Sequence, residues 1–124
     1  MKKKILVIDD EASITRLLKL NLEQTGNYIV REENDGTKGL AAAREFKPDL
    51  LLLDVMMPEV DGGDVAASIE ADAQLKKTPV VFLTAAVKKE ELIERGNVIG
   101  GYPYVAKPLD VKGVIAVIEK QLGG

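Results

Sequence analysis

The sequence contains neither cysteine nor histidine, and these two absences narrow the chemistry that the chain can perform. Without cysteine, the chain forms no disulfide, uses no thiolate nucleophile and offers no cysteine-based metal site. Without histidine, it lacks the commonest general base, the usual zinc ligand and a phosphohistidine of its own. Its chemistry must therefore use carboxylates, hydroxyls, lysines and the backbone.

Charge and length exclude further classes of protein. The 17 basic and 20 acidic residues give a net charge of −3, which offers no electrostatic case for direct binding to nucleic acid. The basic start, Met1 to Lys4, resembles the first part of a signal peptide. The apolar run that follows, Ile5 to Ile8, is too short to complete such a signal or to cross a membrane. We therefore expect a soluble, cytoplasmic protein with no membrane partner.

Short apolar runs alternate with amphipathic stretches along the chain. The apolar runs predict strands at residues 5–8, 28–33, 50–53, 80–83 and 102–106. Apolar residues at helical spacing predict helices at residues 14–22, 39–46, 65–73, around 92–93 and at 111–122. This alternation indicates an α/β fold, (βα)5, in which a doubly wound, five-stranded parallel sheet is covered on both faces. We expect one domain over residues 1–124, with Tyr102–Ala106 as an edge strand because it contains Pro103.

The stretch from Pro48 to Gly63, PDLLLLDVMMPEVDGG, is the centre of this pattern. Its four consecutive leucines are too few for a free-standing helix, and they predict a strand buried on both faces that ends at Asp54. A charge is unwelcome inside such a sheet, so this aspartate is expected at the mouth of a crevice beyond the strand. The alternative is a helix N-cap, but Pro58 makes the following run turn-forming rather than helical.

Polar residues follow four of the predicted strands: Asp9 with Asp10, Asp54, Thr84 and Lys107. In an open parallel sheet, ligands bind at the carboxyl ends of the strands, so these side chains are expected at one edge. Each has a structural alternative: Asp10 or Ser13 could cap the first helix, Thr84 could cap the fourth, and Lys107 could be a surface lysine. Their occurrence together favours a functional site over four separate structural roles.

The residue types at this edge indicate phosphoryl transfer. Crowded carboxylates raise one another's pKa unless a cation joins them, and an oxygen-only site of this size suits Mg²⁺. Asp9 and Asp10 would hold the metal, which leaves Asp54 as a carboxylate nucleophile. Lys107 would supply a fixed positive charge, and Thr84 a hydrogen bond to a phosphoryl oxygen. The expected product is an aspartyl phosphate.

Over its full length, the sequence resembles the receiver domains of two-component response regulators, including the chemotaxis regulators. The motifs that carry the resemblance are Asp9-Asp10, Asp54-Val55-Met56-Met57-Pro58, Asp61-Gly62, Thr84-Ala85, and Tyr104 three residues before Lys107-Pro108. The resemblance implies the flavodoxin-like strand order 2-1-3-4-5, for which this family is a standard example. It also implies a signalling switch, not a conventional enzyme, that catalyses its own phosphorylation and slow dephosphorylation.

The resemblance assigns roles to individual residues. Asp54 matches the phosphoacceptor. The carboxylates of Asp9, Asp10 and Asp54 match the family's carboxylate ligands for Mg²⁺. The backbone carbonyl of Met56 matches a further ligand. Thr84 and Tyr104 match a switch pair that remodels the face formed by the fourth helix, fifth strand and fifth helix; the alternative for Tyr104 is a packing residue. The implied partners are a sensor histidine kinase or phosphotransfer protein, which donates the phosphoryl group, and a downstream target protein.

Some positions depart from the commonest family pattern. Gly39 and Gly101 stand where alanine is frequent, and Pro103 precedes the switch tyrosine, which affects how freely the fifth strand moves. Met56 and Ala86, two residues after Asp54 and Thr84, match positions beside the approach of hydrolytic water. Neither can orient or activate a water molecule, so slow dephosphorylation is expected.

Two other functions compete with the phosphoacceptor switch. A phosphatase of the haloacid-dehalogenase type would need an aspartate two residues after the nucleophile, where this chain has Met56. A pseudo-receiver that only binds proteins would not need the acidic and basic residues that are all present here. The sequence leaves no room for an output domain after residue 124, which suggests either a single-domain regulator or an excised receiver.

Overall fold

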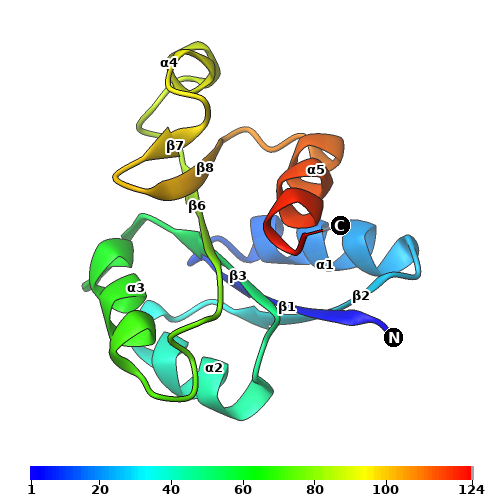
Figure 1. Ribbon diagram of the computed structural model, residues 1–124, viewed down its shortest axis with the longest axis vertical. Helices are drawn as coiled ribbons and strands as arrows, with labels where there is room; N and C mark the ends of the chain where they lie inside the picture. The colour runs from blue at the N-terminus through cyan, green and yellow to red at the C-terminus, as the bar shows by residue number, and fades with distance from the viewer. Residues whose placement is uncertain (124) are drawn as a thin grey trace.

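In a computed structural model that describes residues 1–123, five parallel strands form a central sheet with helices on both faces (Figure 1). The strands are β1 (Lys3–Ile8), β2 (Tyr28–Glu33), β3 (Leu50–Asp54), β6 (Val80–Thr84) and β8 (Tyr102–Ala106). Their order is β2-β1-β3-β6-β8, which confirms the expected flavodoxin-like order. Gly124, the last residue of the expected domain, lies outside the described residues.

Three further short strands were not predicted. β7 (Val98–Ile99) pairs antiparallel with β8, and β4 (Met56–Met57) pairs with β5 (Val60–Asp61) in a small separate ribbon. Gly100 and Gly101, with φ of 61° and 86°, form the two-residue turn between β7 and β8. Such a turn needs positive φ at both positions, which glycine adopts readily. β8 is the outermost of the five parallel strands, but β7 pairs with Tyr102 and Pro103 on its outer side, so the prediction that β8 is the edge of the whole sheet is wrong.

The helices lie in the connections between the parallel strands. They are α1 (Ala12–Gln24), α2 (Gly39–Phe46) after a 3₁₀ turn at Gly36–Lys38, α3 (Gly62–Ala71), α4 (Lys89–Glu94) and α5 (Val111–Gln121). Figure 1 shows α1 and α5 together on one face of the sheet and α2 and α3 on the other. No helix within residues 1–123 is long and apolar enough to span a membrane.

The start of α1 differs from the sequence expectation. Neither Asp10 nor Ser13 caps this helix, because Glu11 occupies the N-cap position and its side chain makes no capping hydrogen bond. Instead, Asp9 Oδ1 accepts a hydrogen bond of 2.9 Å from the Glu11 N–H. The acids therefore form a short loop between β1 and α1, and one oxygen of Asp9 is used to hold this loop.

The core consists of two apolar layers, one on each face of the sheet. In β3, Leu50 and Leu52 pack into one layer and Leu51 and Leu53 into the other, and all four are fully buried. β1 divides its residues in the same way, so the central strands need apolar side chains on both faces. This burial confirms the interpretation of the leucine run and fixes the positions of the acids that follow these strands.

Candidate functional site

Three carboxylates meet at the carboxyl ends of β1 and β3. These strands are neighbours with Ile8 opposite Leu53, so the residues that follow them lie side by side. Asp9, Asp10 and Asp54 each offer an oxygen atom, and these oxygens lie within 4.8 Å of one another. Asp9 and Asp54 are buried, whereas Asp10 is exposed. The structure thus brings together the three acids that the sequence placed at one edge.

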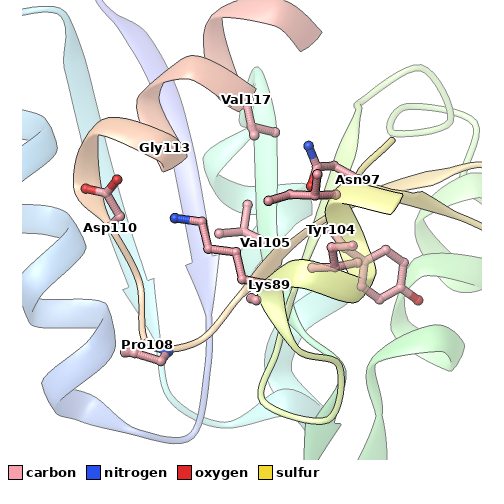
Figure 2. Close-up of a pocket in the computed structure, with 11 residues that line it drawn as sticks. Lys89, Asn97, Tyr104, Val105, Pro108, Asp110, Gly113 and Val117 are labelled. Atoms are coloured by element: carbon pink, nitrogen blue, oxygen red, sulfur yellow. The ribbon is translucent and has the colours of Figure 1, made fainter. Parts of the chain in front are cut away.

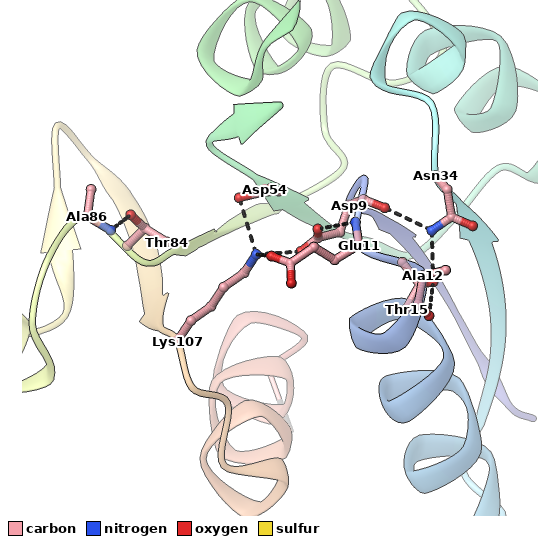
Figure 3. A network of polar contacts seen from close by, with 9 residues as sticks. All are labelled: Asp9, Glu11, Ala12, Thr15, Asn34, Asp54, Thr84, Ala86 and Lys107. Carbon is pink, nitrogen blue, oxygen red and sulfur yellow. Dashed lines mark hydrogen bonds and ion pairs between the residues drawn. The ribbon is translucent and has the colours of Figure 1, made fainter. Parts of the chain in front are cut away.

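Lys107 reaches into this cluster from the end of β8 (Figure 3). Its ammonium nitrogen lies 2.8 Å from Asp9 Oδ2, 3.3 Å from Glu11 Oε1 and 3.6 Å from Asp54 Oδ1. The Lys107 N–H donates to the Thr84 carbonyl at 2.7 Å, which fixes the backbone next to β6. The side chain is only 10% exposed, so Lys107 is not an ordinary surface lysine.

The environment raises the pKa of two of these groups, Asp54 and Lys107. Burial and the negative charge of Asp9 raise the pKa of Asp54 to about 6, although Lys107 opposes this shift. Burial alone would lower the pKa of Lys107, but the carboxylates of Asp9 and Asp54 outweigh it and hold this pKa above its usual value. At neutral pH, Asp54 is therefore largely ionised and faces a charged lysine.

The donor set fits a small, hard cation. Among residues 1–123, Asp9 Oδ2 is the buried side-chain oxygen without a hydrogen bond of good geometry, although the Lys107 ammonium is close to it. Carboxylate oxygens that converge in this way are the ligands that Mg²⁺ prefers. Met56 lies two residues after Asp54, in β4, and its side chain is 71% exposed. Asp9, Asp10 and Asp54 could thus hold Mg²⁺ from one side, with the other side open to water.

Thr84 is buried at the end of β6, but its hydroxyl faces away from the acids. Thr84 Oγ1 accepts a hydrogen bond of 3.0 Å from the Ala86 N–H (Figure 3). Since α4 begins only at Lys89, Thr84 does not cap that helix. Ala86 itself is exposed. The hydroxyl is thus held by the backbone of the loop after β6 and contacts none of the three acids.

Tyr104 lies on β8, opposite Phe82 of the neighbouring strand β6. Its ring packs against that of Phe82, with the centroids 5.1 Å apart. With Lys89 and Asn97, Tyr104 lines a cavity of about 160 Å³ between α4, β8 and α5 (Figure 2). Its position serves packing and also places it at the surface that was expected to change on phosphorylation.

The sequence analysis missed three residues around the site. Glu11 contacts Lys107, and its position as a third consecutive acid after β1 was a usable signal. Asn34 and Thr15 hydrogen-bond to each other and thereby join the loop after β2 to the first turns of α1. Asn34 begins the turn sequence Asn34-Asp35-Gly36, but nothing in the sequence pairs it with Thr15, because their contact depends on how β1 and β2 lie side by side.

The comparisons with known proteins agree on one family. The model of the response regulator receiver domain matches residues 5–119. The DNA-binding dual master transcriptional regulator RpaA of Synechocystis sp. is 39% identical over 119 residues, which cover 96% of this chain and 48% of RpaA. The polar-differentiation response regulator DivK of Brucella anthropi is 34% identical over 125 residues, which cover 99% of this chain and 98% of DivK.

A solved structure supports the same assignment. The chemotaxis protein CheY4 of Vibrio cholerae superposes with a TM-score of 0.81 at 27% identity, over 97% of this chain and 98% of that one. The chain spans about half the length of RpaA and of the other regulators that it matches first. Because the family model covers nearly all of the sequence, the chain belongs to the family of response regulator receiver domains.

Proposed function

We propose that this receiver domain works as a phosphoacceptor switch in which Asp54 accepts the phosphoryl group. The observation that carries the proposal is the position of Lys107, whose ammonium lies among the carboxylates of Asp9, Glu11 and Asp54 at one edge of the sheet. An acceptor carboxylate with a cation on each side can receive an anionic group without accumulating negative charge.

The proposed reaction transfers a phosphoryl group from a phosphohistidine of a sensor kinase or a phosphotransfer protein. An ionised oxygen of Asp54 forms a bond to phosphorus as the bond from phosphorus to the histidine nitrogen breaks, and the leaving imidazole takes up a proton. The pKa of about 6 keeps most Asp54 ionised at neutral pH. Lys107 balances charge on the transferred oxygens, and Mg²⁺ held by Asp9, Asp10, Asp54 and the Met56 carbonyl would neutralise charge in the same way.

Thr84 and Tyr104 are proposed to transmit the change. The Thr84 hydroxyl now accepts from the Ala86 N–H. A phosphoryl group on Asp54 is a strong acceptor, so Thr84 would leave the Ala86 N–H and donate to the phosphoryl group. This movement of Thr84 would open space next to β8, and the Tyr104 side chain would move into that space. The face between α4, β8 and α5 would then bind a target protein differently in the two states.

Phosphorylation by a small donor tests the proposal. Incubation with acetyl phosphate and Mg²⁺ should add one phosphoryl group, detected by intact mass, and peptide mapping should place it on Asp54. Asp54→Asn should remain unlabelled, whereas Asp49→Asn, a matched change just before the other end of β3, should be labelled like the wild type. Equal labelling of Asp54→Asn, or labelling in excess chelator, would contradict the proposal. Release of many phosphates per protein molecule would favour a phosphatase.

A further inference from the structure

The loop that carries Asp9 and Asp10 is tied to its neighbours by one side-chain amide. Asn34, in the loop after β2, uses Nδ2 to donate two hydrogen bonds of 2.9 Å, one to the Asp9 carbonyl oxygen and one to Thr15 Oγ1 (Figure 3). The residues that it joins belong to the end of β1 and to the first turns of α1. One amide thus holds three segments together behind the acidic loop.

Thr15 completes this connection from inside the protein. Its side chain is fully buried, and its hydroxyl accepts from Asn34. The single hydroxyl proton can go either to Glu32 Oε1 at 2.9 Å or to the Ala12 carbonyl at 3.1 Å. Either choice leaves the buried oxygen satisfied, which makes the connection stable, whereas loss of one partner would leave a buried polar group unpaired.

The connection ends on Asp9, which is fixed on three sides. Its N–H donates to the Glu33 carbonyl at 3.1 Å, its carbonyl accepts from Asn34, and its Oδ1 accepts from the Glu11 N–H. Its Oδ2 takes part in none of these three hydrogen bonds and lies 2.8 Å from the Lys107 ammonium, within the carboxylate cluster. Like charges in the loop favour its expansion, so contacts that resist this expansion determine how closely the ligand oxygens converge.

We propose that Asn34 and Thr15 are positioning residues that hold the loop after β1 in the shape that binds Mg²⁺. Neither is one of the proposed metal ligands; they would act through the backbone of Asp9. The inference rests on the proposed metal site and adds to it a structural reason for its affinity. Partners that orient metal ligands from outside the coordination sphere typically change metal affinity by about 10–100-fold when they are removed.

Calorimetric titration with Mg²⁺, without any phosphodonor, tests this role. Asn34→Ala and Thr15→Val should each weaken Mg²⁺ binding by about tenfold. Thr15→Ser keeps the hydroxyl and should bind within about twofold of the wild type. Because both residues act through one connection, the double variant should lose about as much affinity as either single variant, not the product of the two losses.

Two matched variants separate positioning from a general loss of stability. Thr25→Val removes a hydroxyl at the other end of α1, where Oγ1 donates to the Leu22 carbonyl, and Asn21→Ala removes an amide on the outer face of that helix. Both should leave Mg²⁺ affinity unchanged. If Thr25→Val weakens Mg²⁺ binding as much as Thr15→Val does, the effect is general destabilisation and the inference is wrong.

Amide exchange of the metal-free protein provides a second readout. Exchange of the Glu11 N–H, which donates to Asp9 Oδ1, should accelerate in Asn34→Ala and Thr15→Val and stay near the wild-type rate in Thr25→Val. Wild-type affinity in both Asn34→Ala and Thr15→Val would overturn the inference while leaving the proposed function intact. A wild-type protein that binds no Mg²⁺ would overturn both, since the metal site itself would then be absent.

Discussion

The Lys107 ammonium lies nearer to Asp9 than to Asp54, at 2.8 Å from Asp9 Oδ2 against 3.6 Å from Asp54 Oδ1. The lysine is therefore paired most closely with a carboxylate that we propose as a metal ligand, and only secondarily with the proposed phosphoacceptor. A cation that binds to Asp9 would compete with Lys107 for this carboxylate and would leave the ammonium free to approach Asp54 and a group attached to it.

Replacement of Lys107 should separate metal binding from phosphoryl transfer. In Lys107→Met, loss of a positive charge beside the carboxylates should lower the Kd for Mg²⁺, because a competing cation is gone. The rate of labelling by acetyl phosphate should fall by about 100-fold, since one source of charge stabilisation is removed. Calorimetry and a mass time course measure the two effects. Lys112→Met on the outer part of α5 is the control and should change neither the Kd for Mg²⁺ nor the rate of labelling. Weaker Mg²⁺ binding in Lys107→Met would contradict the idea that Lys107 competes with the metal for Asp9.

The raised pKa of Asp54 predicts a pH dependence of stability in metal-free protein. The pKa is about 6 in the folded state and 3.8 for the unperturbed group, so the folded protein binds more protons than the unfolded one between these values. Stability from this group is complete below about pH 4 and is lost as the pH rises through 6. Asp54→Asn cannot ionise at this position, so it should be about 3 kcal/mol more stable than wild type at pH 8 and show little difference at pH 4. Urea unfolding in chelator at both pH values measures this; equal stability at pH 8 would contradict the shift.

The hydroxyl of Thr84 should be needed for signalling but not for phosphorylation. Thr84→Ala should still be labelled on Asp54, because the hydroxyl is held by the Ala86 N–H and does not contact the acids. The change in amide exchange along α4 and around Tyr104 on phosphorylation should be clearly smaller than in wild type, whereas Thr84→Ser should behave like wild type. Identical exchange before and after phosphorylation of the wild type would exclude a conformational switch.

Met56 and Ala86 should set a long phosphoryl lifetime. Both side chains are exposed, so polar replacements there should not disturb the core. The double variant Met56→Asn/Ala86→Glu supplies groups that can orient and activate water, and phosphate release after removal of the donor should accelerate by about tenfold or more. Ala73→Glu, at an exposed position beyond α3, is the control for added charge. Unchanged release in the double variant would show that these positions do not govern water access.

Gly62 should be required for the geometry of the phosphoacceptor. A Cβ at Gly62 would overlap the Asp54 carbonyl oxygen and approach the Val55 Cα to 2.8 Å, whereas one at Gly63 would meet only the movable Asp61 side chain at 3.1 Å. Gly62→Ala should therefore lower the free energy of unfolding by about 2 kcal/mol or more and slow the labelling of Asp54, since the backbone must shift. Gly63→Ala is the matched control and should change both much less. Urea unfolding and the mass time course compare the two variants, and equal effects would contradict the steric argument.

The central part of the fold could be predicted because its sequence signals are local and redundant. The leucine run from Leu50 to Leu53 needs burial on both faces, and only a central parallel strand between two helical layers provides this. Once the strands are placed, the position of Asp54 and Lys107 at one edge follows from topology alone. The distances between them do not, because they depend on side-chain placement at the ends of strands that are far apart in sequence.

What the sequence did not predict lies mostly in pairwise contacts. Gly100-Gly101 was a turn signal for β7, but the two-residue strands that flank it are too short to show alternation. The role of Asn34 depends on the register of β2 beside β1, which places Glu33 opposite Ile8. A one-residue shift would move Asn34 away from the Asp9 carbonyl, and no property of Asn34 or Thr15 alone reveals that register.

The short strand β7 also determines which borders of the sheet remain open to other polypeptides. A strand at the border of a sheet offers unpaired backbone groups to which another chain can add a strand, and this is a common route to aggregation. β7 occupies that position beside β8, so a partner that approaches this side meets a hairpin instead of the full length of β8. At the opposite border, β2 carries three consecutive charged residues, Arg31, Glu32 and Glu33. Charged border strands resist the addition of further strands, so association with other proteins should occur through side chains on the helical faces and not by extension of the sheet.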